Sequence, residues 1–168
     1  MRTVLALLLP LLGAGCAATT PEGTLRSLYR DSRDGDDDLA ALERRLDQVI
    51  ALLDAGEVRT PAEKLYAAGC LLDSTDPLEV ARASELALAA AEEGDPRGLP
   101  LAAEAIDRER LLLGDKQRYG TQYFYTEATG RWSLYPWDTG TTDAERRAMG
   151  VPSLSEALDR LDELNEED

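Results

Sequence analysis

The chain has 168 residues and contains no histidine. Histidine is the usual proton shuttle near neutral pH and the commonest metal ligand in proteins. Its absence excludes a catalytic triad in which histidine is the base, and it disfavours a zinc site. We therefore expect no metal and no cofactor, and an enzyme built on this chain would need carboxylates to move protons.

Cysteine is scarce as well, and Cys16 and Cys70 are the two copies. Cys70 lies among apolar residues of a predicted helix, where no basic residue close in sequence would lower the pKa of its thiol. We expect Cys70 to be buried and inert, and the alternative is a reactive thiol. Because Cys16 is predicted below to carry lipid, no internal disulfide is available.

Positive charge is in the minority, because 18 lysine and arginine residues stand against 33 aspartate and glutamate residues, a net charge of −15. Phosphate backbones and anionic lipid headgroups repel such a chain. We therefore expect no nucleic-acid partner and no basic face that docks on a membrane. A composition of 30% charged and 43% hydrophobic residues is that of a globular domain rather than a disordered chain.

The amino terminus has the features of an export signal in the usual order. Arg2 supplies one positive charge, and an apolar run from Val4 to Leu12 follows it. A helix that spans a bilayer needs about 20 apolar residues, so this shorter run predicts the core of a signal peptide. Small residues occupy positions 13–15, and Cys16 comes directly after them.

The string Leu12-Gly13-Ala14-Gly15-Cys16 resembles the lipobox of bacterial lipoproteins, although Gly13 stands where that pattern most often has leucine. The resemblance implies cleavage before Cys16 and lipid on its thiol, which would anchor the protein in the cell envelope without a membrane-spanning helix. The resemblance also implies that the lipoprotein is sorted to the outer membrane in a Gram-negative cell, because Ala17 rather than aspartate follows the cysteine. The alternative is an ordinary signal peptide, cut after Ala14 or Ala17, which would leave a soluble protein.

The rest of the chain reads as one domain. We expect a signal peptide over residues 1–15, a lipidated tether over 16–23, a single helical domain over 24–164 and an acidic tail over 165–168. After a weakly signalled helix near the start of the domain, apolar periodicity and capping boxes predict four longer helices between residues 38 and 113. Pro100 is expected to interrupt the first turn of the fourth, so that its regular part starts at this proline.

Four helices joined by short loops should pack antiparallel with their neighbours. The expected fold is therefore mainly α, built of antiparallel helical hairpins. It resembles the stacking of tetratricopeptide-type or Sel1-type repeats, but the sequence shows no strict self-match at the period of those repeats. A small helical bundle is the equal alternative.

The amino-acid composition changes after Gly114, because seven of the nine aromatic residues lie between positions 119 and 137. Residues 123–126 and 131–135 favour strands with a turn between them, which predicts one β-hairpin over about 119–136. A lone hairpin is marginally stable in water, so we expect one of its faces to pack on the helices. Two short helices should follow, each opened by a capping box.

The string Lys116-Gln117-Arg118-Tyr119-Gly120-Thr121-Gln122 is the most unusual in the chain. Together with residues 132–136, 143–148 and 150–154, it resembles an uncharacterised bacterial family of domains of unknown function, over roughly residues 78–160. The resemblance implies a fold and a site region, and it brings no reaction or ligand with it. Members of that family often carry a His-Ala-Asp stretch where this chain has residues 91–94, so chemistry that used that histidine would be lost here.

Two functional hypotheses follow. The first is a non-enzymatic envelope module that binds a protein or a peptide on the helical hairpins and the β-hairpin. The alternative is a small-ligand receptor or a histidine-independent enzyme with a site around residues 117–122 and 145–147. Its candidate ligand-binding residues are Lys116, Gln117, Tyr119, Thr121, Gln122, Arg146, Arg147 and Glu109.

In the enzyme alternative, Glu109 or Asp107 would act as acid or base. Arg146 or Arg147 would clamp an anionic group, since a guanidinium can hold a carboxylate through two hydrogen bonds. The third alternative is a purely structural role for this string, in which Gln117 and Gln122 satisfy backbone groups at the junction of helix and hairpin.

Overall fold

A computed structural model gives the structure of residues 20–33 and 38–166. The predicted signal peptide, the lipidation at Cys16 and tether residues 16–19 lie outside these described residues. Among the helices of the described part, none is both long and apolar enough to cross a membrane.

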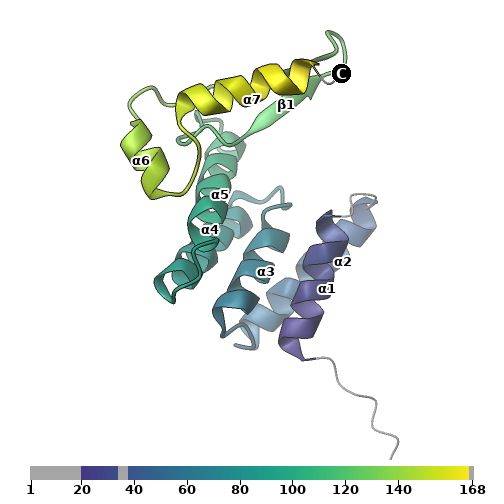
Figure 1. Cartoon of the computed structure of the whole chain (residues 1–168). Coiled ribbons are helices and arrows are strands. Elements are labelled where there is room, and N and C mark those ends of the chain that lie inside the picture. Colours follow the sequence, from purple (N-terminus) through teal and green to yellow (C-terminus); the bar gives the residue numbers. More distant parts are fainter. Residues whose placement is uncertain (1–19, 34–37, 167–168) are drawn as a thin grey trace, which may run out of the picture.

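The described chain is mainly helical, and a hairpin of two strands separates its first five helices from two more (Figure 1). The first five helices are α1 (Pro21–Arg33), α2 (Leu39–Asp54), α3 (Pro61–Leu71), α4 (Pro77–Glu92) and α5 (Gly98–Leu112). The later elements are β1 (Tyr123–Thr126), β2 (Arg131–Leu134), α6 (Asp143–Ala148) and α7 (Leu154–Glu166).

The first five helices form an array of helical hairpins, which confirms the predicted fold class. Each helix packs on its neighbour in the chain, and both α1 and α5 also pack on α3. This order places α1, α3 and α5 side by side, with α2 and α4 as their hairpin partners (Figure 1). The β-hairpin, α6 and α7 follow α5 in the chain, and the loop between α6 and α7 returns to the first turn of α5, where Gly150 lies against Pro100 (Figure 1).

Local capping signals account for the helix starts. Thr60 and Glu63 form the predicted capping box at α3. The side chain of each residue accepts a hydrogen bond from the backbone amide of the other. Asp38 caps α2 by accepting a hydrogen bond from the Ala41 amide, and Asp76 caps α4 in the same way. These caps satisfy amides that have no partner inside the helix.

Two helix starts differ from the sequence prediction. α1 begins at Pro21, so the last residues of the predicted tether, 21–23, belong to its first turn. α5 begins at Gly98, two residues before the proline that was expected to interrupt it. Pro100 is tolerated there because the amides of the first helical turn have no acceptor within the helix.

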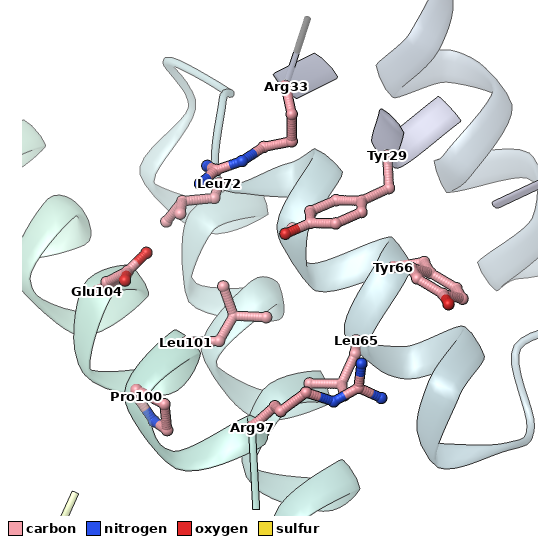
Figure 2. A pocket seen from close by; sticks show the side chains of 10 residues that line it. Tyr29, Arg33, Leu65, Tyr66, Leu72, Arg97, Pro100, Leu101 and Glu104 are labelled. Carbon is pink, nitrogen blue, oxygen red and sulfur yellow. The ribbon is translucent and has the colours of Figure 1, made fainter. Parts of the chain in front are cut away.

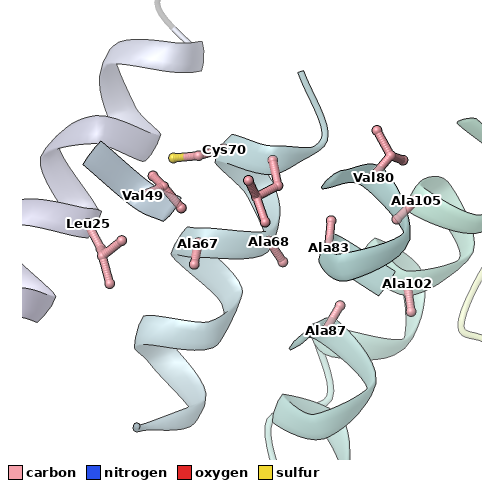
Figure 3. Close-up of a cluster of buried hydrophobic side chains, with 11 residues drawn as sticks. Leu25, Val49, Ala67, Ala68, Cys70, Val80, Ala83, Ala87, Ala102 and Ala105 are labelled. Carbon is pink, nitrogen blue, oxygen red and sulfur yellow. The ribbon is translucent and has the colours of Figure 1, made fainter. Parts of the chain in front are cut away.

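The core between α3, α4 and α5 is built largely of alanine (Figure 3). Small side chains let the helix axes approach closely, and Gly98 marks the tightest contact. A Cβ atom at this position would lie 2.2 Å from the backbone oxygen of Ala87 on α4. The fully buried alanines of the core are Ala67, Ala68, Ala83, Ala87, Ala102 and Ala105.

Cys70 belongs to the same core and is fully buried, as predicted (Figure 3). Burial raises the pKa of its thiol to about 12, because the charged thiolate would lose its hydration. The thiol therefore stays protonated near neutral pH and behaves as a small apolar side chain.

The predicted β-hairpin is present, with β1 at the expected residues 123–126 and β2 ending one residue before the expected 135. Tyr123 pairs with Leu134 and Thr126 with Arg131. Cross-strand aromatic contacts stabilise it, with Tyr125 and Trp132 ring centroids 5.4 Å apart. Residues 119–122 form a loop that leads into β1, and a buried carboxylate on α5 holds this loop.

The hairpin packs on α7, as the sequence predicts for a hairpin that needs a partner. Asn165 accepts a hydrogen bond from the Trp132 amide at 2.9 Å and donates one to the Trp132 carbonyl at 3.2 Å. The hydroxyl of Tyr123 donates to the backbone oxygen of Ala157 on α7. α7 extends to Glu166, so the first two residues of the predicted acidic tail belong to this helix, and residues 167–168 lie outside the described part of the chain.

Candidate functional site

Asp107 organises the unusual loop that follows α5. Its carboxylate is fully buried and accepts hydrogen bonds from the amides of Arg118, Tyr119 and Thr121, at 2.6, 2.7 and 2.9 Å. The Thr121 hydroxyl donates a fourth, at 2.8 Å. Gly120 has a φ of +79°, which allows the backbone to turn around the carboxylate. With four donors around it, Asp107 is committed to holding the loop.

Gln117 is also fully buried, and its side chain bonds backbone groups just outside the two strands of the hairpin. Its side-chain nitrogen donates to the carbonyls of Gln122 and Tyr135, at 3.2 and 2.8 Å, and its side-chain oxygen accepts from the Gln122 amide at 2.8 Å. Gln117 thus satisfies backbone groups where the two ends of the hairpin meet. The Gln122 side chain donates to the Thr121 hydroxyl and to the carbonyl of Glu104.

Arg146 holds the same loop from the side of α6. Its guanidinium is 2% exposed and donates to the carbonyl of Tyr119 at 3.1 Å and to that of Thr141 at 2.6 Å. Asp143 lies 3.6 Å from it as an ion-pair partner. Among the described residues, one terminal nitrogen of Arg146 is buried without a hydrogen-bond partner.

The structure therefore brings some of the sequence-predicted site residues together and leaves others apart. Gln117, Tyr119, Thr121 and Gln122 form one network with Asp107, and Arg146 braces it. Lys116 and Arg147 are exposed and Glu109 is half-buried. None of these last three contributes a side-chain contact to the network that the structure describes.

A cleft of about 200 Å³ opens between α1, α3 and α5 (Figure 2). The ring of Tyr29 packs against Gly69 on α3, where a Cβ atom would be 2.3 Å from a ring carbon. Tyr66 stands beside it, with the ring centroids 5.7 Å apart. The lining consists of Tyr29, Arg33, Leu65, Tyr66, Gly69, Leu72, Arg97, Pro100, Leu101 and Glu104.

A second cleft of about 260 Å³ lies on the other side of α5. Tyr119, Gly120 and Thr121 of the motif line it, together with residues of β1, α7 and the loop before α7. Pro100 and Glu104 line both clefts, so the two clefts adjoin across the first two turns of α5. We call the two together the α5 groove.

The charges in the α5 groove contrast with those of the whole chain. Its charged lining residues are Arg33, Arg97, Arg160 and Glu104. Arg97 is held by Asp95 through two short hydrogen bonds, at 2.9 and 2.6 Å. Arg160 pairs with Glu163 at 2.9 Å, so two of the three guanidinium groups that line the groove already have a carboxylate beside them.

Glu104 is the one charged lining residue of opposite sign. Burial raises the pKa of its carboxyl group, and the nearby Arg33 guanidinium offsets part of that rise. Such perturbed carboxyl groups are typical of binding sites, although structural networks also produce them.

Sequence reasoning did not find this groove. Tyr29 and Arg33 lie on a helix with weak signals, and Glu104 is one acidic residue among many. No local pattern links Tyr29 and Arg33 to Glu104, because these residues lie more than 70 positions apart in the chain. The sequence did single out Tyr119 and Thr121, which reach the groove's second cleft.

No protein-family model matches the chain, and neither the curated proteins nor the solved structures contain a match to it. Among the described residues, no group of three histidine, cysteine, aspartate or glutamate side chains is placed to hold a metal ion.

Proposed function

We propose that the chain is an envelope lipoprotein, anchored through lipid on Cys16, whose helical domain binds a protein or peptide in the α5 groove without catalysis. The observation that carries the binding role is the groove itself, which combines an apolar floor with charged groups from α1, α5 and α7. Concave, largely apolar surfaces with a few polar groups are the usual places for ligands.

The anchor is supported by the sequence of the amino terminus. The order of one positive charge, an apolar run, small residues and Cys16 is that of a lipoprotein signal. The short polar stretch before α1 would keep the domain close to the membrane surface, where envelope proteins are its neighbours. The outer membrane is the proposed location in a Gram-negative cell, because Ala17 follows the cysteine.

Binding is better supported than catalysis. The alternative places a receptor or enzyme site at residues 117–122 and 145–147, yet the groups there already have partners. Asp107 accepts four hydrogen bonds, and Gln117 and Arg146 bond the backbone of the loop and its neighbours. The motif then supports the wall of the second cleft through the backbone of residues 119–121.

Replacing the lipidated cysteine tests the anchor. Cys16→Ser should move the folded protein from the membrane fraction to the soluble envelope fraction, because no thiol remains to take the lipid. Cell fractionation followed by immunoblotting measures the change, and Cys70→Ser is the matched control. Continued membrane retention of Cys16→Ser would contradict the lipid anchor.

Photo-crosslinking tests the groove. A photoreactive side chain placed at Arg33 or at Thr121 should form an adduct with a recurrent envelope protein in intact cells. The same group at Glu85, an exposed position on α4 outside the groove, is the control. Adducts should appear at both groove positions and be at least tenfold weaker at Glu85. Equal labelling at all three positions, or none, would argue against a binding groove.

A further inference from the structure

Three polar side chains in the cleft between α1, α3 and α5 converge on one space. The guanidinium of Arg33, the hydroxyl of Tyr29 and the carboxylate of Glu104 all reach toward it, above Leu72 and Leu101 (Figure 2). Tyr29 and Arg33 come from the last two turns of α1, whereas Glu104 comes from the second turn of α5. The cleft therefore brings two donors and an acceptor together from opposite walls.

The Arg33 guanidinium is near enough to the carboxylates of Glu104 and Asp73 to lower the pKa of each, yet it forms no ion pair with either among the described residues. In the part of the chain that the structure describes, no hydrogen bond or ion pair engages the Arg33 side chain, the Tyr29 hydroxyl or the Glu104 carboxylate. Arg97, at the other end of the cleft, differs because Asp95 already holds it. Polar groups in a protein cleft without protein partners are satisfied by water or by a ligand.

The signs of the three groups restrict what that ligand can be. Arg33 donates hydrogen bonds only, the Tyr29 hydroxyl can also donate, and ionised Glu104 only accepts. A ligand group that is only anionic would be repelled by Glu104, and one that is only cationic would be repelled by Arg33. A ligand that satisfies all three presents a cationic donor next to an acceptor oxygen. An α-ammonium group with its adjacent carbonyl or carboxylate has this arrangement.

The volume and the apolar floor of the cleft match a single amino-acid residue of a ligand. Binding sites for drug-sized ligands have volumes of about 300–1,000 Å³, and this cleft has about 200 Å³. Its apolar lining comes from Leu65, Leu72, Leu101 and Pro100. An apolar side chain placed there would be removed from water beside the polar groups that hold the main chain.

We propose that this cleft binds an α-amino group with its neighbouring carbonyl or carboxylate and an apolar side chain, as in the first residue of a peptide or a free amino acid. The α-ammonium pairs with Glu104, and the oxygen accepts from Arg33 and Tyr29. The inference rests on the proposed function of the α5 groove and names the chemistry that this groove selects.

Acetylation of a peptide's amino terminus provides the test. The full chain in detergent is titrated with a pool of pentapeptides that begin with leucine and carry fluorescein at the carboxyl end. The same pool with an acetylated amino terminus is titrated in parallel, and fluorescence anisotropy measures both. The free-amine pool should bind at least tenfold more tightly, because only the ammonium group can pair with Glu104. Unlabelled leucine as competitor shows whether a free amino acid also occupies the cleft.

Three substitutions assign the contacts. Glu104→Gln should abolish the preference for the free amine, whereas Arg33→Gln and Tyr29→Phe should weaken both pools alike. Arg30→Gln, on the exposed side of α1, is the control and should change neither affinity. Tyr29→Phe keeps the ring on Gly69, so it removes the hydroxyl while the packing of α1 on α3 is preserved.

The outcomes separate this inference from the proposed function. Equal binding of both pools, or no binding of either pool while the groove crosslinks persist, overturns the α-amino assignment alone. Loss of peptide binding together with loss of the groove crosslinks overturns the binding function as well. A preference for the free amine that survives Glu104→Gln also overturns the assignment, because the ammonium would then be held elsewhere.

Discussion

At the scale of single residues, a few buried polar side chains determine the path of the chain between α5 and β1. Asp107, Gln117 and Arg146 are each at most 2% exposed, and all three bond backbone groups of the loop or of the hairpin ends. A buried backbone amide without a partner is costly, so each of these side chains replaces bonds that a strand or helix would supply. The loop is ordered because these partners are in place.

Asp107→Asn should lower the stability of the protein, because it removes the buried carboxylate that holds the loop. Asparagine keeps one acceptor oxygen and turns an NH₂ group toward amides that also donate, so at least one buried amide loses its partner. We expect the free energy of unfolding to fall by at least about 2 kcal/mol, since an unsatisfied buried group costs about 1–3 kcal/mol. Urea denaturation followed by circular dichroism measures it.

Asp115→Asn is the matched control for this substitution. Asp115 is exposed, and its change should leave the urea midpoint within experimental error. Similar midpoints for Asp107→Asn and Asp115→Asn would show that the loop does not depend on the buried carboxylate.

At the scale of elements, the separation of α4 and α5 is set by small residues at their contact. Gly98 packs against the backbone of α4, and a Cβ atom there would lie 2.2 Å from the Ala87 carbonyl oxygen and 2.8 Å from the Ala91 nitrogen. Backbone atoms within a helix cannot move aside as a flexible side chain can. The position of α5, and with it that of Pro100 and Glu104 in the groove, depends on this contact.

Gly98→Ala should therefore destabilise the protein although alanine favours helix. Overpacking of a core costs about 1–3 kcal/mol, which exceeds the gain from replacing glycine in a helix. Thermal unfolding measures the loss. Gly140→Ala is the control, because its Cβ would meet only the end of the Asp138 side chain. A melting temperature for Gly98→Ala at or above that of Gly140→Ala would rule out the close contact.

At the scale of the whole molecule, the excess of acidic residues is the dominant physical property. Eighteen basic and 33 acidic residues leave a net charge of −15. Repulsion among these charges favours expanded states over the compact one. The lining of the α5 groove has three arginines and one glutamate, so basic side chains are concentrated there within an acidic chain.

Salt should stabilise the protein for this reason. Raising the concentration of sodium chloride from 10 to 150 mM shortens the screening length from about 30 to about 8 Å. We expect the melting temperature to rise by a few degrees, since about 1 kcal/mol corresponds to about 2–4 °C at this chain length. Differential scanning calorimetry checks it, with an equal osmolality of sucrose as the control. A fall in melting temperature with salt would mean that attractive ion pairs outweigh the repulsion.

The helices, their caps and the hairpin could be predicted from the sequence because their signals are local. Thr60 and Glu63 act within one helical turn, and residues 123–126 pair with strand partners a few positions away. The starts at Pro21 and Gly98 differed by a few residues because proline ends no helix when it lies in the first turn. The predicted fold class was accordingly confirmed, while helix ends were less accurate.

The candidate site could be predicted only in part. The sequence pointed to residues 117–122 by their unusual polarity, but polarity alone cannot tell a ligand contact from a bond to the protein's own backbone. Asp107 and Arg146 turned out to supply backbone bonds because tertiary packing buried them. The lipid anchor at Cys16 remains a prediction.

By itself the sequence determined the absence of histidine, the acidic charge and the sequence of helices and hairpin. These properties depend on composition or on residues within a few positions of one another. Only the tertiary structure decided that Tyr29, Arg33 and Glu104 face one space and that α5 separates two adjoining clefts. The physical reason is that a cleft is made by packing between helices, and the distances between its walls are set by core contacts such as Gly98 against Ala87.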